Sequence, residues 1–335
     1  MVFNGLTHLF NELNLLPILY EYYNTSRLYI AGDTHIEFYD SELTNKIKNE
    51  DEIIYLMKYV DGLLYTVDFT DRVKIWNEKE CIKTLKGHEK DISQIIVVNG
   101  HPCTTSNDKT VKIWDSATGL CLRTLEGHTD CVNDIIEINS LLYTASDDKT
   151  IKIWNFEGTL LNTLEGHTDW VLVLLIMGNK LCSSSRDSTV RIWVDNHCAT
   201  ILEGSEKGIN EMIKIDNKRI CTADNNNTIK IWNIDTELLI QTFQGYCGKY
   251  TSHIININSK LCSIDYDNKS IKIWDLDTGV LVNIITNGNE YFLLSNFNNS
   301  LCFCNHTEHF SQIQVLNLYD FQVTTISEGY NLCIA

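Results

Sequence analysis

A tryptophan-centred pentapeptide that recurs about every 40 residues constrains the fold of this protein most strongly. Five copies have the form V/I-K-I-W-N/D, and a sixth, VRIWV at 190–194, differs only at its last residue. Two weaker copies place Tyr39 and Leu316 in the same slot, so eight slots span the sequence. A fixed period of this length predicts a series of small, equivalent structural units. The six tryptophans, spaced 38 to 42 residues apart, are Trp76, Trp114, Trp154, Trp193, Trp232 and Trp274.

The residues between the tryptophans predict four short β-strands per repeat. Each pentapeptide alternates apolar and polar residues, as a half-buried strand does. In the repeat 119–155, the segments LCLRTL, VNDIIEI, LLYTAS and IKIW each fit a strand, and no helical period separates them. One such sheet cannot bury its face alone, but sheets in series can close radially and cover one another. We therefore predict an all-β fold of eight four-stranded blades, with seven blades as the alternative.

Three repeats also share polar residues at fixed spacing. Each begins with a Gly-His pair, an Asp follows the His by 20 residues, a Trp follows the Asp by 6, and a Ser precedes the Asp by 2. The pairs are Gly87-His88, Gly127-His128 and Gly166-His167, and the other members are Ser106, Asp108 and Trp114, Ser146, Asp148 and Trp154, and Ser185, Asp187 and Trp193. With the tryptophan slots, this pattern makes essentially the whole sequence resemble the WD40-repeat β-propellers.

The resemblance implies a structural role for these polar residues. In that family a His, a Ser or Thr, an Asp and a Trp form a hydrogen-bonded relay inside the blade, and a buried His needs such partners. The same residue types also occur in hydrolase triads. A set that recurs three times in tandem indicates framework, however, because a catalytic set occurs once.

The resemblance further predicts one propeller domain over residues 1–335. Residues 1–16 are expected to form a latch strand or a short helix. The Gly-His slots are degenerate at Gly204-Ser205, Gly245-Tyr246 and Asn287-Gly288, and Asn226 and Asn268 replace the Asp, so we expect those blades to depend more on apolar packing. The predicted blades cover residues of about 17–48, 50–86, 88–126, 128–165, 167–203, 206–244, 250–286 and 290–328.

Composition and charge exclude several classes of protein. The sequence has Lys+Arg 27 against Asp+Glu 44, a net charge of −17, which disfavours nucleic acid as a partner and permits basic proteins or peptides. No stretch approaches the ~20 uncharged apolar residues of a membrane helix. The N-terminus has no basic segment before an apolar core, so we expect no signal peptide and no membrane partner.

Eight of the twelve cysteines recur at equivalent positions of different repeats. Equivalent positions in neighbouring blades are too far apart for a disulfide, so we interpret these cysteines as small buried apolar side chains in a reducing compartment. This predicts a cytoplasmic protein, with the nucleus as the alternative. The pair Cys302-x-Cys304 lacks a matching second pair, and zinc takes four ligands, so no metal is expected. The eight are Cys81, Cys103, Cys121, Cys182, Cys198, Cys221, Cys262 and Cys302.

The sequence contains none of the common catalytic motifs. It has no GxxxxGK[ST], no GxGxxG after a strand and no HExxH, so we expect no catalytic residues and no cofactor. We predict a non-catalytic scaffold or adaptor, a monomeric propeller within a larger complex, which binds proteins or peptides at its rim and channel mouth. The candidate partner-binding residues depart from the repeat pattern or stand beside its Asp: Trp170, Arg186, Asn107, Asp147, Tyr246 and Tyr266.

A substrate-recognition or regulatory subunit of a ubiquitin ligase, or of another multiprotein enzyme complex, is the alternative function. The segment 183–193 resembles a blade of the F-box/WD-repeat adaptors, in which an Arg at the position of Arg186 helps to hold a phosphorylated degron. Those adaptors use further arginines, and here the matching positions are Ser93, Asn133 and Leu172. One guanidinium does not neutralise a doubly charged phosphate. The first 16 residues are also too few for an F-box, so degron binding is not expected to carry over.

Overall fold

The strands of this protein form eight four-stranded antiparallel sheets, each with its strands in sequence order. The computed structural model describes residues 18–21, 28–31, 35–39, 44–48, 54–68, 70–77, 79–226, 228–244, 254–265, 269–286, 290–297, 300–306, 311–319 and 321–330. These residues include no helix. The predicted all-β class is therefore confirmed. Among the same residues, no helix is long and apolar enough to cross a membrane.

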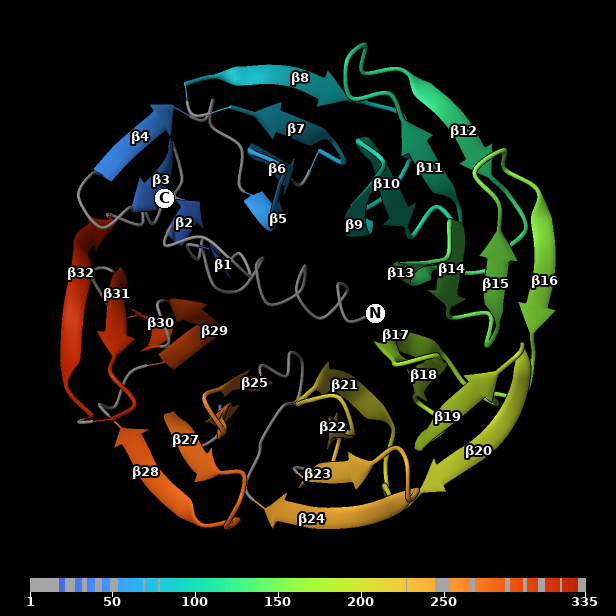
Figure 1. Cartoon of the computed structure of the whole chain (residues 1–335). Coiled ribbons are helices and arrows are strands. Elements are labelled where there is room, and N and C mark those ends of the chain that lie inside the picture. Colours follow the sequence, from blue (N-terminus) through green and yellow to red (C-terminus); the bar gives the residue numbers. More distant parts are fainter. Residues whose placement is uncertain are drawn as a thin grey trace. The chain divides into compact units, whose positions relative to one another are not determined.

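The first four sheets follow the sequence from its N-terminal side (Figure 1). The first is β1 (Ile18–Glu21), β2 (Leu28–Ala31), β3 (His35–Tyr39) and β4 (Thr44–Lys48). The second is β5 (Ile54–Val60), β6 (Leu63–Asp68), β7 (Val73–Trp76) and β8 (Cys81–Leu85). The third is β9 (Ile92–Val98), β10 (His101–Ser106), β11 (Val111–Trp114) and β12 (Cys121–Leu125). The fourth is β13 (Val132–Ile138), β14 (Leu141–Ser146), β15 (Ile151–Trp154) and β16 (Leu160–Leu164).

The other four sheets repeat this order. The fifth is β17 (Val171–Met177), β18 (Lys180–Ser185), β19 (Thr189–Val194) and β20 (His197–Glu203). The sixth is β21 (Ile209–Lys214), β22 (Arg219–Asp224), β23 (Thr228–Asn233) and β24 (Leu238–Gln244). The seventh is β25 (Ile254–Ile257), β26 (Lys260–Asp265), β27 (Ser270–Asp275) and β28 (Leu281–Thr286). The eighth is β29 (Glu290–Phe297), β30 (Ser300–His306), β31 (Ser311–Leu316) and β32 (Val323–Tyr330).

The repeat in the sequence and the sheet in the structure are offset by one strand. The repeat 119–155 contains β12, β13, β14 and β15, but β12 pairs with β11 of the third sheet, whereas β16 completes the fourth. Each repeat of this kind therefore supplies the outermost strand of one sheet and the three inner strands of the next. The third to sixth sheets are thus tied together by the covalent backbone as well as by packing.

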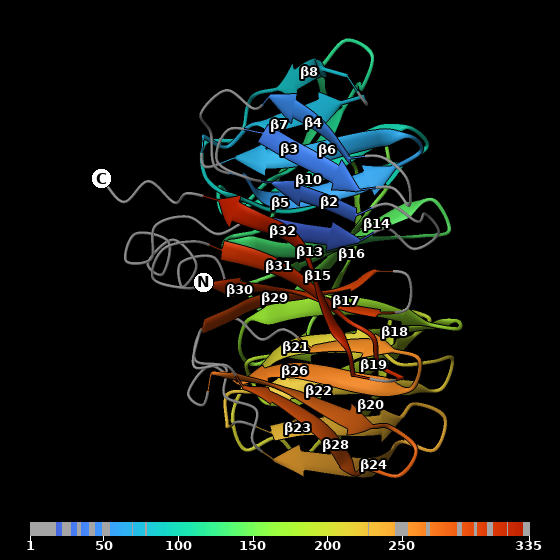
Figure 2. The ribbon, with the colours of Figure 1, turned by 90° about the vertical axis from the view of Figure 1, so that its left-hand side faces the viewer.

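The protein divides into two compact units, which we call the terminal unit and the central unit. The terminal unit comprises residues 1–69, 76–80 and 245–335, and the central unit comprises residues 70–75 and 81–244. In the central unit, β9, β13, β17 and β21 are successive neighbours, so the third to sixth sheets follow one another through their first strands. In the terminal unit, β1 lies beside β29 and β5, and Figure 2 shows the red eighth sheet next to the blue first sheet.

The buried tryptophans pack between consecutive sheets of the central unit. Trp154 of the fourth sheet belongs to a buried cluster with Ile113 of the third, and Trp193 of the fifth belongs to one with Ile153 of the fourth. Gly127 leaves room for the indole ring of Trp154, because a Cβ at this position would lie 3.2 Å from Cη2 of the ring. Its φ of +151° is also a backbone conformation that favours glycine. The apolar faces of these sheets therefore cover each other, as the repeat predicted.

The cysteines differ according to their strand. Cys103, Cys182, Cys221 and Cys262 are buried in second strands, and burial raises the thiol pKa of Cys103 and Cys182 to about 12. Cys121, on the outermost strand β12, is exposed, so our expectation of burial is wrong there, because the fourth strand has no sheet over its outer face. The eight cysteines whose side chains are described are all free thiols. The side chains of Cys302 and Cys304 lie outside the described residues.

Candidate functional site

A His, a hydroxyl, an Asp and a Trp are hydrogen-bonded inside three consecutive sheets. In the fourth sheet, Nδ1 of His128 lies 2.7 Å from Oδ2 of Asp148, and Nε2 lies 2.8 Å from Oγ1 of Thr144. Trp154 donates its indole N–H to the same hydroxyl at 2.9 Å. Equivalent bonds join His88, Asp108, Thr104 and Trp114 in the third sheet and His167, Asp187, Ser183 and Trp193 in the fifth.

The hydroxyl in this relay is not the one that the spacing suggested. We expected Ser106, Ser146 and Ser185 there, but the structure places Thr104, Thr144 and Ser183 between His and Trp. Ser146 instead donates to the carbonyl of Asp130 at 3.2 Å and accepts the backbone N–H of Asp148 at 3.0 Å. Residues two apart in a strand face the same side, so the pattern alone did not separate the two hydroxyls. Only the distance to the His does so.

The relay has the connectivity of a hydrolase triad but not its accessibility. Thr144 and Ser183 have no exposed surface, and each hydroxyl oxygen already accepts an indole N–H. A nucleophile needs room for a carbonyl carbon beside its oxygen. These fully buried hydroxyls have no such room, so we interpret the three relays as framework.

The framework carboxylates are ionised and firmly held. Burial acts to raise the pKa of Asp148, but hydrogen bonds from His128, Thr150 and the backbone of Thr129, together with the charge of His128, outweigh it. The net result is a pKa well below the usual range. The pKa values of Asp108 and Asp187 are lowered for the same reasons.

The sixth sheet replaces the relay by other polar bonds. The amide of Asn226 donates to Glu206 at 2.8 Å, and Trp232 still donates to a hydroxyl, that of Thr222, at 3.0 Å. Asp224 and Lys230 are buried and lie 3.3 Å apart, Oδ2 to Nζ. We expected this sheet to depend more on apolar packing. That expectation stays a prediction, and the structure adds to it a buried ion pair at the positions that hold Ser146 and Lys152 in the fourth sheet.

Four equivalent turns of the central unit place variable side chains at the same end of their sheets. In each, a backbone N–H beside the framework Asp position donates to a carbonyl just before the first strand. The bonds run from Asn107 to Asp91, from Asp147 to Cys131, from Arg186 to Trp170 and from Asn225 to Gly208, over 2.9 to 3.0 Å. This shared geometry brings the predicted residues Asn107, Asp147, Trp170 and Arg186 to one edge of the third to fifth sheets.

The side chains at these turns have different partners. Asn107 donates to the carboxylate of Asp91 at 3.3 Å, and Asn133 donates to that of Asp147 at 2.7 Å. Asn210 donates to the side-chain oxygen of Asn225. At the fifth sheet, the guanidinium carbon of Arg186 lies 5.0 Å from the centre of the Trp170 ring. Asn107 and Asp147 are buried, whereas Trp170 and Arg186 are half-buried.

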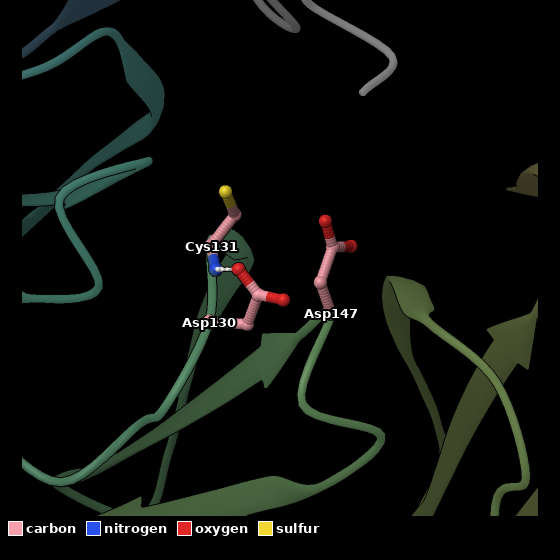
Figure 3. Close-up of side chains that lie close together, drawn as sticks. All are labelled: Asp130, Cys131 and Asp147. Carbon is pink, nitrogen blue, oxygen red and sulfur yellow. Dashed lines mark hydrogen bonds between the residues drawn. The ribbon is translucent and has the colours of Figure 1, made fainter.

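Asp130, Cys131 and Asp147 form a compact group at the fourth sheet (Figure 3). Their possible ligand atoms all lie within 4.8 Å of one another. Burial raises the pKa of the Cys131 thiol and of Asp147, and the two nearby carboxylates raise that of the thiol further. Asp130 also accepts the backbone N–H of Cys131 at 2.9 Å. The group thus supplies three possible ligand atoms, one fewer than the four of a structural zinc site, and its geometry alone does not define a metal centre.

Tyr246 and Tyr266 lie outside the described residues. Asn133 and Asn210 belong to the site but were not predicted from the sequence. They stand two residues after Cys131 and Gly208, on the first strands, and their shared register with Ser93 and Leu172 was the available signal.

Four stretches of the sequence match the model of the WD40 family, described as WD domain, G-beta repeat, at residues 79–115, 119–155, 158–194 and 196–233. The computationally designed Ika8 protein has a similar crystal structure, with a TM-score of 0.75, 18% identity, and coverage of 90% of this protein and 97% of that one. The WD40 beta propeller domain of Doa1 gives a TM-score of 0.60 at 18% identity, covering 79% of this protein and 94% of that domain. No curated protein matches the sequence significantly.

Repeated four-stranded sheets with structural His-Asp relays define a β-propeller of WD repeats. The protein contains WD40 repeats over the four matched stretches, and its fold is that of a WD40 propeller. The expected repeat family and fold class are thus confirmed. Domains of this fold generally serve as protein-interaction scaffolds and are typically non-catalytic.

Proposed function

We propose that this protein is a non-catalytic scaffold that binds a protein or peptide at the turns around Trp170 and Arg186. One observation carries the proposal. The polar side chains that repeat are engaged in framework bonds, whereas the side chains at the four equivalent turns differ from sheet to sheet. A repeated fold needs no such variety for its own stability. Half-buried Trp and Arg are residue types that dominate binding energy at interfaces.

The net charge of the protein and its free thiols bear on the kind of partner and on the cellular compartment that we propose. The net charge of −17 favours partners with basic surfaces, because opposite potentials speed association and give specificity. Free thiols on an exposed strand, such as Cys121, favour a reducing compartment and therefore the cytoplasm. We place the protein, as a single propeller, within a larger complex.

Affinity purification with matched variants tests this function. We expect the intact protein to capture partners that a Trp170→Ala, Arg186→Ala double variant loses, with an unchanged melting temperature. The control is a Leu120→Ala, Arg123→Ala variant, which removes exposed side chains at and beside the outermost strand β12. If the double variant keeps every partner, the turns around Trp170 are not the binding face. Recovery of a cullin or its adaptor among the lost partners would assign the role of a ubiquitin-ligase subunit.

A further inference from the structure

Within the described residues, the side chain of Arg186 differs from its three counterparts in having no hydrogen-bond partner. Asn107, Asp147 and Asn225 each bond to a side chain of their own sheet. In the same part of the structure, Arg186 has only its stacking contact with Trp170, and its buried Nε has no partner. A buried donor that is left unpaired is unfavourable, so an arrangement of this kind favours an acceptor supplied from outside the protein.

Two differences between the repeats explain why the guanidinium of Arg186 has no hydrogen-bond partner. The position that holds Asp91 in the third sheet holds Trp170 in the fifth, and the position of Asn133 holds Leu172. Leu172 is buried and Trp170 presents its ring face, so neither side chain offers an oxygen to the guanidinium. The local sequence thus removes the polar side chains that these two positions supply in the neighbouring sheets, and it supplies an aromatic surface in their place.

The arginine is also held in position. Its backbone N–H donates to the carbonyl of Trp170 at 2.9 Å. On the next sheet, Gly208 abuts its backbone so closely that a Cβ there would lie 2.8 Å from the Arg186 carbonyl oxygen. A guanidinium fixed by its main chain and by stacking loses little rotamer freedom when it binds, which favours affinity.

We propose that Arg186, held against Trp170, anchors a carboxylate of the protein partner, from an Asp or Glu side chain or from the partner's own C-terminus. This inference rests on the proposed function and specifies the chemistry of the same site. The planar fork of a guanidinium matches the two oxygens of a carboxylate. Basic residues beside that carboxylate would face Asp130 and Asp147, which belong to the neighbouring fourth sheet.

The neighbouring acidic groups favour a single negative charge over a double one. The charge of Arg186 reaches Asp147, whose carboxylate accepts its hydrogen bond from Asn133 instead. A phosphate dianion would face Asp147 and the exposed Asp130 with only one guanidinium to balance it. A carboxylate carries half that charge and is therefore the better match.

Nuclear magnetic resonance of the arginine side chains tests the proposal on the full-length protein. The sequence has six arginines, so a sample labelled with ¹⁵N-arginine gives six Nε–H signals, and an Arg186→Lys variant identifies that of Arg186. The probes are N-acetyl-glutamate amide, N-acetylglycine and, as the neutral control, N-acetyl-glutamine amide, at constant ionic strength. We expect both carboxylates to shift the Arg186 signal saturably while the amide does not.

Variants then define the anchor. Trp170→Leu is expected to weaken carboxylate binding about tenfold, since it removes the stacking surface, whereas Arg123→Lys on β12 leaves binding unchanged. A stronger response to N-acetyl-phosphoserine amide than to the carboxylates would overturn the proposal in favour of a phosphate site. The absence of a saturable shift, or an equal shift with the glutamine probe, would overturn it as well. Partner loss from the Trp170, Arg186 double variant without any carboxylate response would leave the scaffold function standing and reject only this anchor.

Discussion

Thr144 joins two side chains that lie 16 and 10 residues away in the sequence. Its hydroxyl contacts Nε2 of His128 and accepts the indole N–H of Trp154, and its own side chain is completely buried. One oxygen thus satisfies two ring nitrogens that have no access to water. Because every buried polar group needs a partner, this hydroxyl stabilises the sheet more than its size suggests.

A Thr144→Val substitution is expected to lower the free energy of unfolding by about 2–4 kcal/mol. Valine preserves the shape but leaves both ring nitrogens unpaired. Urea denaturation measures the loss. The matched control is Thr124→Val on β12, where the exposed hydroxyl accepts from Lys112 and the change should stay within about 0.5 kcal/mol. Equal losses in the two variants would contradict the structural role of the relay.

The framework carboxylates predict how stability depends on pH. Asp108, Asp148 and Asp187 have folded-state pKa values below the unfolded value of about 3.9. Their contribution is therefore complete at neutral pH, and it is lost as the pH falls through the folded-state pKa values, because the unfolded protein takes up protons first.

We expect the melting temperature to fall as the pH drops below about 5. An Asp148→Asn variant is expected to melt lower at pH 7 and to show a shallower decline toward acid, since one of the three hydrogen-bonded carboxylates is gone. Asp195→Asn, at an exposed turn, is the control and should keep the wild-type slope. A decline that is just as steep in Asp148→Asn as in the wild type would show that other groups dominate acid unfolding.

At the scale of the element, the sixth sheet keeps the fold with different chemistry. Its backbone register matches that of the fourth sheet, since Thr222 pairs with Lys230 as Thr144 pairs with Lys152. In the fourth sheet, however, Lys152 donates to the hydroxyl of Thr163 at 3.2 Å, whereas Lys230 turns to the buried Asp224. A sheet of this family thus tolerates the loss of its His when other buried polar groups are paired.

A double-mutant cycle tests this pair. Lys230→Met alone is expected to destabilise the protein by about 3–5 kcal/mol, because it leaves Asp224 buried without its counterion. Asp224→Ser together with Lys230→Met should recover much of that loss, since serine is the residue at this position in the third to fifth sheets. Lys152→Met is the control and should change stability by less than about 1 kcal/mol. Additive losses in the cycle would mean that the two side chains do not interact.

In the molecule as a whole, each of the third to fifth sheets depends on a neighbouring sheet to bury its apolar side chains. Ser93 donates to the carbonyl of Val132, Asn133 donates to that of Val171, and Asp134 accepts the backbone N–H of Leu174 at 2.8 Å. These bonds cross from the third sheet to the fourth and from the fourth to the fifth. With the shared apolar clusters, they make the sheets depend on one another for stability.

Thiol labelling under native conditions measures this dependence. Cys103, Cys182 and Cys221 are buried in three different sheets of the central unit, so we expect them to react with a thiol reagent at one common slow rate, while the exposed Cys121 reacts at once. We further propose that the protein is a single cooperative domain, in which case Cys262 of the terminal unit reacts together with them. Separate rates within the central unit would show that its sheets open independently.

The repeated all-β architecture can be predicted from the sequence alone. The tryptophan slots and the alternation of apolar and polar residues are local patterns, and a strand displays them wherever it lies. The same spacing identified the three His-Asp pairs, because a constant separation in equivalent sheets gives a constant separation in space. The resemblance to the family added the hydrogen-bonded relay of which these pairs are part.

Which side chains meet across sheets and turns could not be predicted from the sequence and is visible only in the folded protein. Thr144 and Ser146 face the same side of one strand, and only the distance to His128 separates their roles. The pairing of Asp224 with Lys230 and the stacking of Arg186 on Trp170 depend on rotamers and on the depth of burial. A local pattern encodes which face a residue occupies, whereas hydrogen bonding at a few ångströms depends on how neighbouring elements fill the space around it.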